Sequence, residues 1–381
     1  MKKLYYIYLE FIVFFSSLLF FGVILFFGIN TDIQAHAGFV QQITNGSLLP
    51  PANFIYYLTI YIVALLNTDT FSLYISSTIV LSLSVTAKFT VTRLFAIKHY
   101  RNILKDNTAS DAIIIIASVL LLVVFSLPTN NFYLGQIPPN VWHNSTTIFL
   151  MPFALLLFWL SYNQLVQPTT NRTFIIIILC VLNVLIKPSF FFVFSLSYPL
   201  MLAGRFGFTR YLWLNLLPVI IGSITTVVVY YLIYKLSFGN IHSVEAGIAI
   251  KPLSVWSYYS SNIALSLVFS LVFPIAYIGF YWKDLRKNVL LQYAVIMYLI
   301  AISLFALLSE TGPREFHGNF FWQSVICSYI LFLVITVLFA EKVKTLGMKD
   351  WKNIIILVAF MSHVIAGFLY LVKLLYIGSY I

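Results

Sequence analysis

The sequence predicts an all-α fold, a polytopic bundle of transmembrane helices, and composition and run length carry this prediction. Hydrophobic residues make up 61% of the 381 residues and charged residues only 9%, whereas soluble domains carry roughly 25% charge. The mean hydropathy is +0.97. Several apolar runs reach the roughly 20 residues that a helix needs to cross a hydrocarbon core of about 30 Å. We therefore expect a single transmembrane domain over residues 1–381, with no soluble domain.

The basic residues predict the orientation of this bundle. Lys and Arg number 22 against 11 acids, a net charge of +11, which a nucleic-acid-binding protein would also show. Most of these cations, however, fall in alternate loops between apolar runs. Placing those loops in the cytoplasm satisfies the positive-inside rule and puts the N-terminus inside. The excess charge then indicates topology and contact with anionic membrane lipids, and we expect no nucleic acid partner.

About eleven spans follow from the apolar runs and the charge alternation. The predicted spans are 5–29, 71–96, 112–127, 146–165, 173–188, 189–204, 212–234, 257–281, 289–309, 320–340 and 354–377. The apolar segment 54–66 is too short to span and begins after two prolines, so we expect an interfacial or re-entrant helix. It belongs to the first outer loop, 30–70, which we expect to carry juxtamembrane helices.

The first outer loop contains a candidate catalytic pair, Asp32 and His36. Residues four apart lie on the same face of a helix. A carboxylate at a membrane surface can act as a general base when burial tunes its pKa. The alternative is that Asp32 only caps a helix that begins at Ile33, with His36 an interfacial side chain.

The outer loop 128–145 contains side chains that suit a sugar. Gly135 and two prolines exclude a regular helix there. Gln136, Trp142, His143 and Asn144 follow, and amides can bind hydroxyl groups while an indole can cover a sugar face. The alternative is an ordered connecting loop with Trp142 as an interfacial anchor.

A further set of charged candidates lies at two other places on the predicted outer face. The loop 309–319 contains Glu310, Arg314 and His317. An arginine can bind a lipid phosphate through its planar fork, although an internal ion pair with Glu310 or Glu315 is an equal alternative. Lys187 interrupts an apolar stretch and is a second candidate for phosphate contact, because intramembrane charges are costly and usually functional. It could instead extend to the interface.

The order of these features resembles the GT-C superfamily of polyprenyl-phosphate-sugar-dependent integral membrane glycosyltransferases. The similarity begins with one span and then Thr31-Asp32-Ile33-Gln34-Ala35-His36. It continues with a proline-then-aromatic helix entry at 48–57 and with Thr92-Arg93 before a basic loop, and the layout extends over 1–205. The resemblance implies an active site on the lumenal or periplasmic face and inverting transfer from a lipid phosphate sugar. It also implies that Asp32 acts as base or orients the acceptor.

Two departures from the superfamily pattern refine this expectation. Many members carry a paired acid, whereas Ile33 follows Asp32 here, so the second carboxylate is missing. The sequence requires no cofactor, and a divalent cation held by Asp32, His36 and an outer histidine stays an open alternative. Members usually add a C-terminal soluble domain, so here the loops must select the acceptor.

The sequence thus predicts an enzyme of the bacterial inner (plasma) membrane with its active site on the periplasmic or extracellular face. Its substrates would be a polyprenyl-phosphate-linked sugar donor and a glycan or lipid acceptor. The alternatives are a polysaccharide polymerase or ligase, and a non-enzymatic lipid-oligosaccharide flippase or transporter. A transporter should show internal repeats and interrupted spans.

Overall fold

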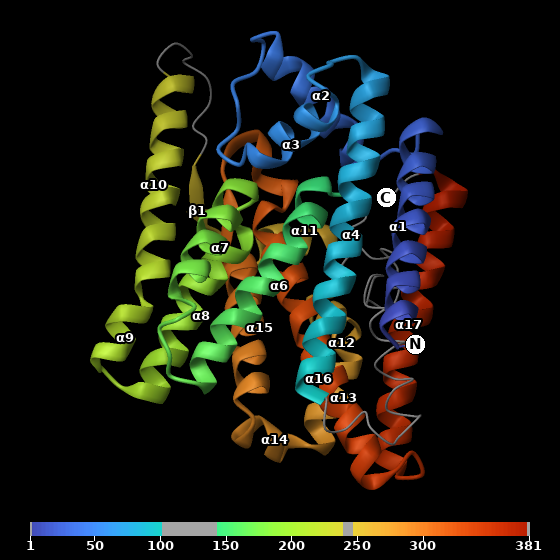
Figure 1. Cartoon of the computed structure of the whole chain (residues 1–381), viewed down its shortest axis with the longest axis vertical. Helices are drawn as coiled ribbons and strands as arrows, with labels where there is room; N and C mark the ends of the chain where they lie inside the picture. The colour runs from blue at the N-terminus through green and yellow to red at the C-terminus, as the bar shows by residue number, and fades with distance from the viewer. Residues whose placement is uncertain (1, 101–142, 239–246, 379–381) are drawn as a thin grey trace.

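The computed structural model describes residues 2–100, 143–238 and 247–378, which are almost entirely helical (Figure 1). The helices are α1 Lys2–Phe26, α2 Asp32–Thr44, α3 Ile55–Val63, α4 Thr70–Tyr100, α6 Ser145–Val166, α7 Thr173–Ile186, α8 Ser189–Phe206, α9 Arg210–Asn215, α10 Leu217–Phe238, α11 Ser254–Tyr259, α12 Ile263–Ser270, α13 Val272–Phe280, α14 Trp282–Lys287, α15 Val289–Leu307, α16 Trp322–Leu346 and α17 Trp351–Ile377. Two 3-10 helices, η1 Gly312–His317 and η2 Asn319–Phe321, precede α16. Strands β1 Ile248–Ile250 and β2 Leu308–Glu310 pair antiparallel.

The prediction of an all-α polytopic membrane protein is confirmed. Eight helices of the described ranges are long and apolar enough to cross a membrane, and a bent pair would make a ninth. Helix α7 is also apolar, but it has only 14 residues. The predicted span 112–127 lies outside the described residues. The count of eleven spans therefore stays a prediction.

One predicted span, 257–281, differs in the structure. Helices α12 and α13 bend by 69° where a single straight helix was expected. The break follows from Pro274, which has no N–H to donate to the Ser270 carbonyl and whose ring would clash with that carbonyl in a continuous helix. Leu271 leaves the helical conformation at this point, with φ −126° and ψ 17°. Apolar run length alone did not reveal this bend.

The bundle is built around α16. Every residue from Trp322 to Ala340 is buried, and the helix packs against α4, α6, α8, α13 and α15. A helix that is apolar on all sides is expected at such a central position. Helix α10, by contrast, exposes Ile224 and Val227, which suits a helix that faces lipid.

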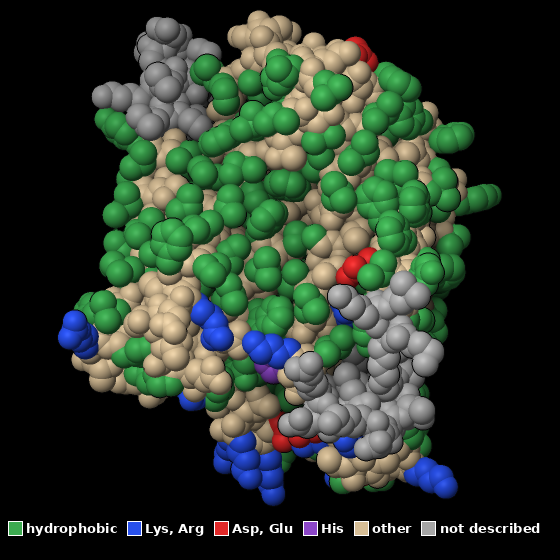
Figure 2. All heavy atoms as spheres, in the orientation of Figure 1, with side chains coloured by type: hydrophobic (Ala, Val, Ile, Leu, Met, Phe, Trp, Pro, Cys, Tyr) green, Lys and Arg blue, Asp and Glu red, His purple; other side chains and the backbone are tan. Residues whose placement is uncertain are grey.

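The bundle has two distinct ends, here named the α2 end and the α14 end. Helices α2 and α3 lie at the first, whereas α9, α14 and the turn between α16 and α17 lie at the other (Figure 1). Lys and Arg side chains collect toward the α14 end, below a wide hydrophobic belt (Figure 2). Which membrane side each end faces remains a prediction from the positive-inside rule.

Helices α2 and α3 form a short layer over the α2 end. Thr31 caps α2 by accepting a hydrogen bond from the Ile33 N–H, and Gln41 of α2 donates to the Thr68 carbonyl just before α4. Helix α3 has nine residues, about 14 Å at 1.5 Å per residue, less than half a hydrocarbon core. It ends where Leu65 and Leu66 adopt positive φ. Its length agrees with the expectation that 54–66 does not span.

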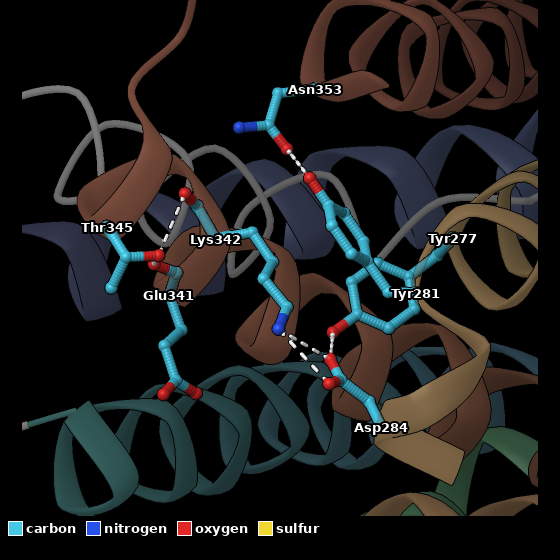
Figure 3. Close-up of polar contacts among 7 residues, drawn as sticks. All are labelled: Tyr277, Tyr281, Asp284, Glu341, Lys342, Thr345 and Asn353. Atoms are coloured by element: carbon cyan, nitrogen blue, oxygen red, sulfur yellow. Dashed lines mark hydrogen bonds and ion pairs between the residues drawn. The ribbon is translucent and has the colours of Figure 1, made fainter. Parts of the chain in front are cut away.

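A compact polar cluster joins four helices at the α14 end (Figure 3). The Lys342 ammonium of α16 lies 2.9 Å and 3.1 Å from the two Asp284 carboxylate oxygens. The Tyr277 hydroxyl donates to Asp284 at 2.7 Å. The Tyr281 hydroxyl donates to Asn353 of α17, and Asn353 donates to the Gly347 carbonyl. These bonds join α13, α14, α16 and α17, and we name this group the α14 cluster.

A candidate active site at the α2 end

Asp32 is the first residue of α2 and does not cap it. The cap is Thr31, so the alternative in which Asp32 caps a helix beginning at Ile33 is wrong. A carboxylate in the first turn is favoured by the helix dipole. The side chain is half-buried and therefore remains available for other contacts.

Asp32 and Lys187 are joined through Asn144. The Asn144 Nδ2 donates to Asp32 Oδ2 at 3.3 Å, and the Lys187 Nζ donates to Asn144 Oδ1 at 2.9 Å. Asn144 is the N-cap of α6, where its Oδ1 also accepts from the Thr147 N–H. Three segments that are far apart in sequence therefore meet here: the start of α2, the start of α6 and the α7–α8 junction.

The Lys187 ammonium has its three donors occupied by neutral oxygens. Besides Asn144, it donates to Thr147 Oγ1 at 2.9 Å and to Thr146 Oγ1 at 3.3 Å. Its Nζ also lies 4.5 Å from the centre of the Trp322 ring, a distance suited to a cation–π contact. Among the described residues it forms no ion pair with a carboxylate.

His36 is held against the start of α6 and among aromatic rings. Its Nδ1 lies 2.7 Å from Ser145 Oγ. The rings of Phe39, Tyr56 and Tyr57 have centroids 5.7, 6.3 and 5.8 Å from the imidazole. Burial lowers the pKa of His36 to about 3, so the imidazole is neutral at physiological pH. A neutral imidazole can accept or relay a proton, but it cannot bind a phosphate as a cation.

Burial and the neighbouring groups shift the pKa of the Asp32 carboxylate in opposite directions. Burial raises its pKa above the usual value, while the Asn144 hydrogen bond and the charges of Lys187 and His317 lower it. A carboxylate with a raised pKa is a stronger proton acceptor once ionised. Perturbed acids of this kind concentrate at functional sites.

The other predicted histidines lie close to this group. His143 is buried in the turn before α6, and its ring centroid is 5.5 Å from that of Trp322. His317, at the end of η1, is close enough for its charge to act on Asp32. We name Asp32, His36, Asn144, Lys187 and Trp322 the α2 cluster, with His143 and His317 at its edge.

The loop 309–319 is partly described. The Asn319 Nδ2 donates to Glu310 Oε2, and Glu315 pairs with Lys251 at 2.7 Å. Glu310 and Glu315 also line a shallow surface hollow together with Val255 and Phe305. The side chain of Arg314 lies outside the described residues, so neither a phosphate contact nor an ion pair can be assigned to it. Gln136 and Trp142 also lie outside them.

Several members of the site were missed from the sequence. Ser145, Thr146 and Thr147 directly follow Asn144, and such a polar run before an apolar helix is a signature of a capped N-terminus. Trp322 begins α16 after a charged loop. Their roles depend on contacts with Lys187 and His36, which spacing along the chain does not reveal.

In residues 2–100, 143–238 and 247–378, no group of three or more His, Cys, Asp or Glu side chains is arranged to hold a metal ion. Asp32 is the acid of the α2 cluster, and its one described side-chain hydrogen-bond partner is an amide donor. A divalent cation at Asp32 would therefore need ligands from substrate or from residues beyond these ranges.

Comparison of the chain with protein-family models, with curated proteins and with solved structures finds no match.

Proposed function

We propose that the chain is a membrane glycosyltransferase of the GT-C type and that the α2 cluster is its active site. One observation carries the proposal: an acid and a neutral histidine of α2 meet the start of α6 and a half-buried lysine of the α7–α8 junction at one end of a hydrophobic bundle. Buried ionisable groups in a membrane protein are costly and mark function by default. The donor would be a polyprenyl-phosphate-linked sugar, and the acceptor a glycan or lipid hydroxyl.

The proposed reaction transfers a sugar with inversion. Ionised Asp32 accepts the proton of the acceptor hydroxyl as its oxygen attacks the anomeric carbon of the donor sugar. The bond from that carbon to the phosphate oxygen breaks, and the polyprenyl phosphate leaves with the electron pair. The cluster supplies electrostatic positioning as well as the base, and general-base catalysis alone contributes about 10²–10⁴-fold.

The remaining predicted residues take substrate roles in this proposal. Arg314 and His317 would contact the donor phosphate, with Glu310 nearby in the same loop. Gln136, Trp142 and His143 would contact sugar. Lys187 was predicted as a phosphate contact, but its three donors are already occupied, so direct binding would require it to exchange one of these bonds.

The proposed orientation places the α2 end on the periplasmic or extracellular face of a bacterial plasma membrane. It follows from the basic residues at the α14 end (Figure 2) and the positive-inside rule. Single cysteines in a background without Cys180 and Cys327, which are both buried, would test it. A cysteine at exposed Asn45 should react with an impermeant maleimide from outside. One at Asn102, in the predicted cytoplasmic loop, should react only after permeabilisation.

The bend between α12 and α13 favours a second candidate, a lipid-oligosaccharide flippase. Broken helices at membrane depth are common in transporters, where they line substrate sites. The α2 cluster does not include this break, and its acid and histidine have no obvious role in moving a neutral glycan. We therefore rank transport second.

One experiment separates the two candidates. The purified protein is reconstituted in vesicles with a polyprenyl-phosphate donor carrying a labelled sugar, and with crude cell-envelope lipid as acceptor. A transferase releases unlabelled polyprenyl phosphate and moves label into the acceptor. A flippase moves the intact labelled lipid between leaflets, without consuming it, and that result would overturn the proposal.

A further inference from the structure

Lys187 is half-buried, and its ammonium points into the protein. A lysine that served only to cover the surface would extend its ammonium to water, yet this one is enclosed by Asn144, Thr146, Thr147 and the Trp322 ring. An ammonium has three donors and no acceptor, and all three donors are used. Among the described residues, therefore, the ammonium is held at a fixed point beside the candidate base without a carboxylate contact.

Asn144 is held from both sides. Its Oδ1 accepts from Lys187 at 2.9 Å and from the Thr147 N–H and hydroxyl at 3.0 and 2.7 Å. These donors identify Oδ1 as the amide oxygen, so Nδ2 must face Asp32, to which it donates at 3.3 Å. The side-chain amide thus separates the carboxylate from the ammonium. A direct ion pair would instead occupy the oxygen lone pairs that a base needs.

We infer that Lys187 and Asn144 are positioning residues for Asp32: the lysine orients the amide, and the amide keeps the carboxylate near the cation but unpaired. The inference rests on the proposed function, because it describes how the proposed base is kept ionised and free. Lys187 then acts through its charge and through Asn144, and it does not contact the substrate directly.

The charges around Asp32 determine the direction of the test. The charges of Lys187 at the α7–α8 junction and of His317 in η1 act on Asp32, and Asp32 acts on Tyr57 of α3. His36, one turn further along α2, is neutral. The Lys187 charge lowers the pKa of Asp32, so its removal raises that pKa. A base works only when ionised, so the acid limb of the rate profile must then move to higher pH. The difference should therefore appear at low pH and disappear at a pH where Asp32 is ionised in both proteins.

The experiment measures kcat/KM of sugar transfer against pH for wild type and Lys187→Met. We expect the acid limb of Lys187→Met to lie about one unit higher, the scale of one nearby opposite charge. Transfer at low pH then falls about tenfold, and the two proteins converge once Asp32 is ionised in both. If Lys187→Met does not fold, Lys187→Gln tests the same limb, because it removes the charge and retains an N–H donor for Asn144.

Lys88→Met is the matched control. Lys88 is also buried, and its Nζ lies 3.9 Å from the centre of the Tyr329 ring. It is 18 residues beyond the start of α4, about 27 Å along the helix from the α2 end. The acid limb of the pH–rate profile of Lys88→Met should coincide with that of wild type.

The inference is overturned if the acid limb of the pH–rate profile does not move in Lys187→Met or Lys187→Gln. It is also overturned if the acid limb of Lys88→Met moves by the same amount. The proposed function fails differently: Asp32→Asn then retains full transfer, or wild type transfers no sugar at all.

Discussion

The two ends of the bundle each combine an aspartate, a lysine and an asparagine, but they connect them differently. In the α14 cluster the Lys342 ammonium contacts both oxygens of Asp284 directly, and Asn353 completes a separate bond to Tyr281 (Figure 3). In the α2 cluster Asn144 lies between Asp32 and Lys187. The same residue types thus make a closed ion pair at one end and a separated pair at the other.

This difference distinguishes a structural contact from a site prepared for chemistry. A direct pair satisfies both charges and joins helices, and its side chains remain about a quarter exposed. A separated pair leaves an enclosed ammonium with no carboxylate contact among the described residues, an arrangement that costs stability and is usually retained for function. We therefore expect the carboxylate of Asp284 to contribute to stability and not to turnover, and the carboxylate of Asp32 to be required for turnover.

The largest expected stability effect compares two buried asparagines. Asn144→Leu removes the cap of α6 and an acceptor of the Lys187 ammonium, so we expect a loss of about 3 kcal/mol in the free energy of unfolding. Asn353→Leu removes two neutral hydrogen bonds and should cost about 1–2 kcal/mol. Thermal unfolding in detergent measures both. Equal losses in the two variants would mean that Asn144 does not stabilise the Lys187 charge.

A pH effect is expected at the α2 end. His36 has a pKa of about 3 in the folded chain against 6.5 for a free imidazole. Its stabilising contribution is therefore complete above pH 6.5 and is lost as pH falls toward 3, by up to about 1.4 kcal/mol per pH unit. His36→Gln should reduce the fall in Tm between pH 6.5 and 5. If Tm falls by the same amount in both proteins, the fold does not hold His36 in its neutral form.

A smaller effect concerns the tyrosine that supports the α14 ion pair. Tyr277→Phe removes a hydroxyl that donates to the Asp284 carboxylate at 2.7 Å, and hydrogen bonds to charged groups are worth about 1.5–3 kcal/mol. Because the carboxylate is partly exposed, we expect the lower figure. Sugar transfer per folded molecule should stay at the wild-type value. Reduced transfer would link this cluster to the reaction.

The smallest effect is expected at the exposed pair of Lys251 and Glu315, whose side chains are 40% and 21% exposed. Lys251→Met should lower the free energy of unfolding by less than about 1 kcal/mol, as is usual for surface pairs. The melting temperature at low and high salt measures it. A loss that matches that of Tyr277→Phe would show that η1 depends on this pair.

The sequence predicted the architecture better than the connections within the site. Long apolar runs specify helices such as α4 and α17 because a helix is the simplest way to satisfy backbone groups in lipid. The bend at Leu271 was missed, although Pro274 signalled it. Asp32, His36, Asn144 and Lys187 were all selected as polar residues in an apolar chain. The position of Asn144 between Asp32 and Lys187 depends on how α2, α6 and α7 pack. Residue spacing along the chain does not predict that packing.

The central claim is that the α2 cluster performs chemistry and the α14 cluster holds helices together. The matched variants Asp32→Asn and Asp284→Asn test it most directly, because each replaces a carboxylate by an amide of nearly the same shape. Melting temperature and transfer from a polyprenyl-phosphate-sugar donor are measured for both purified proteins. We predict that Asp32→Asn keeps the wild-type Tm and loses about 10²–10⁴-fold in turnover, while Asp284→Asn lowers Tm and leaves turnover per folded molecule unchanged. Near-normal turnover in Asp32→Asn would contradict the account.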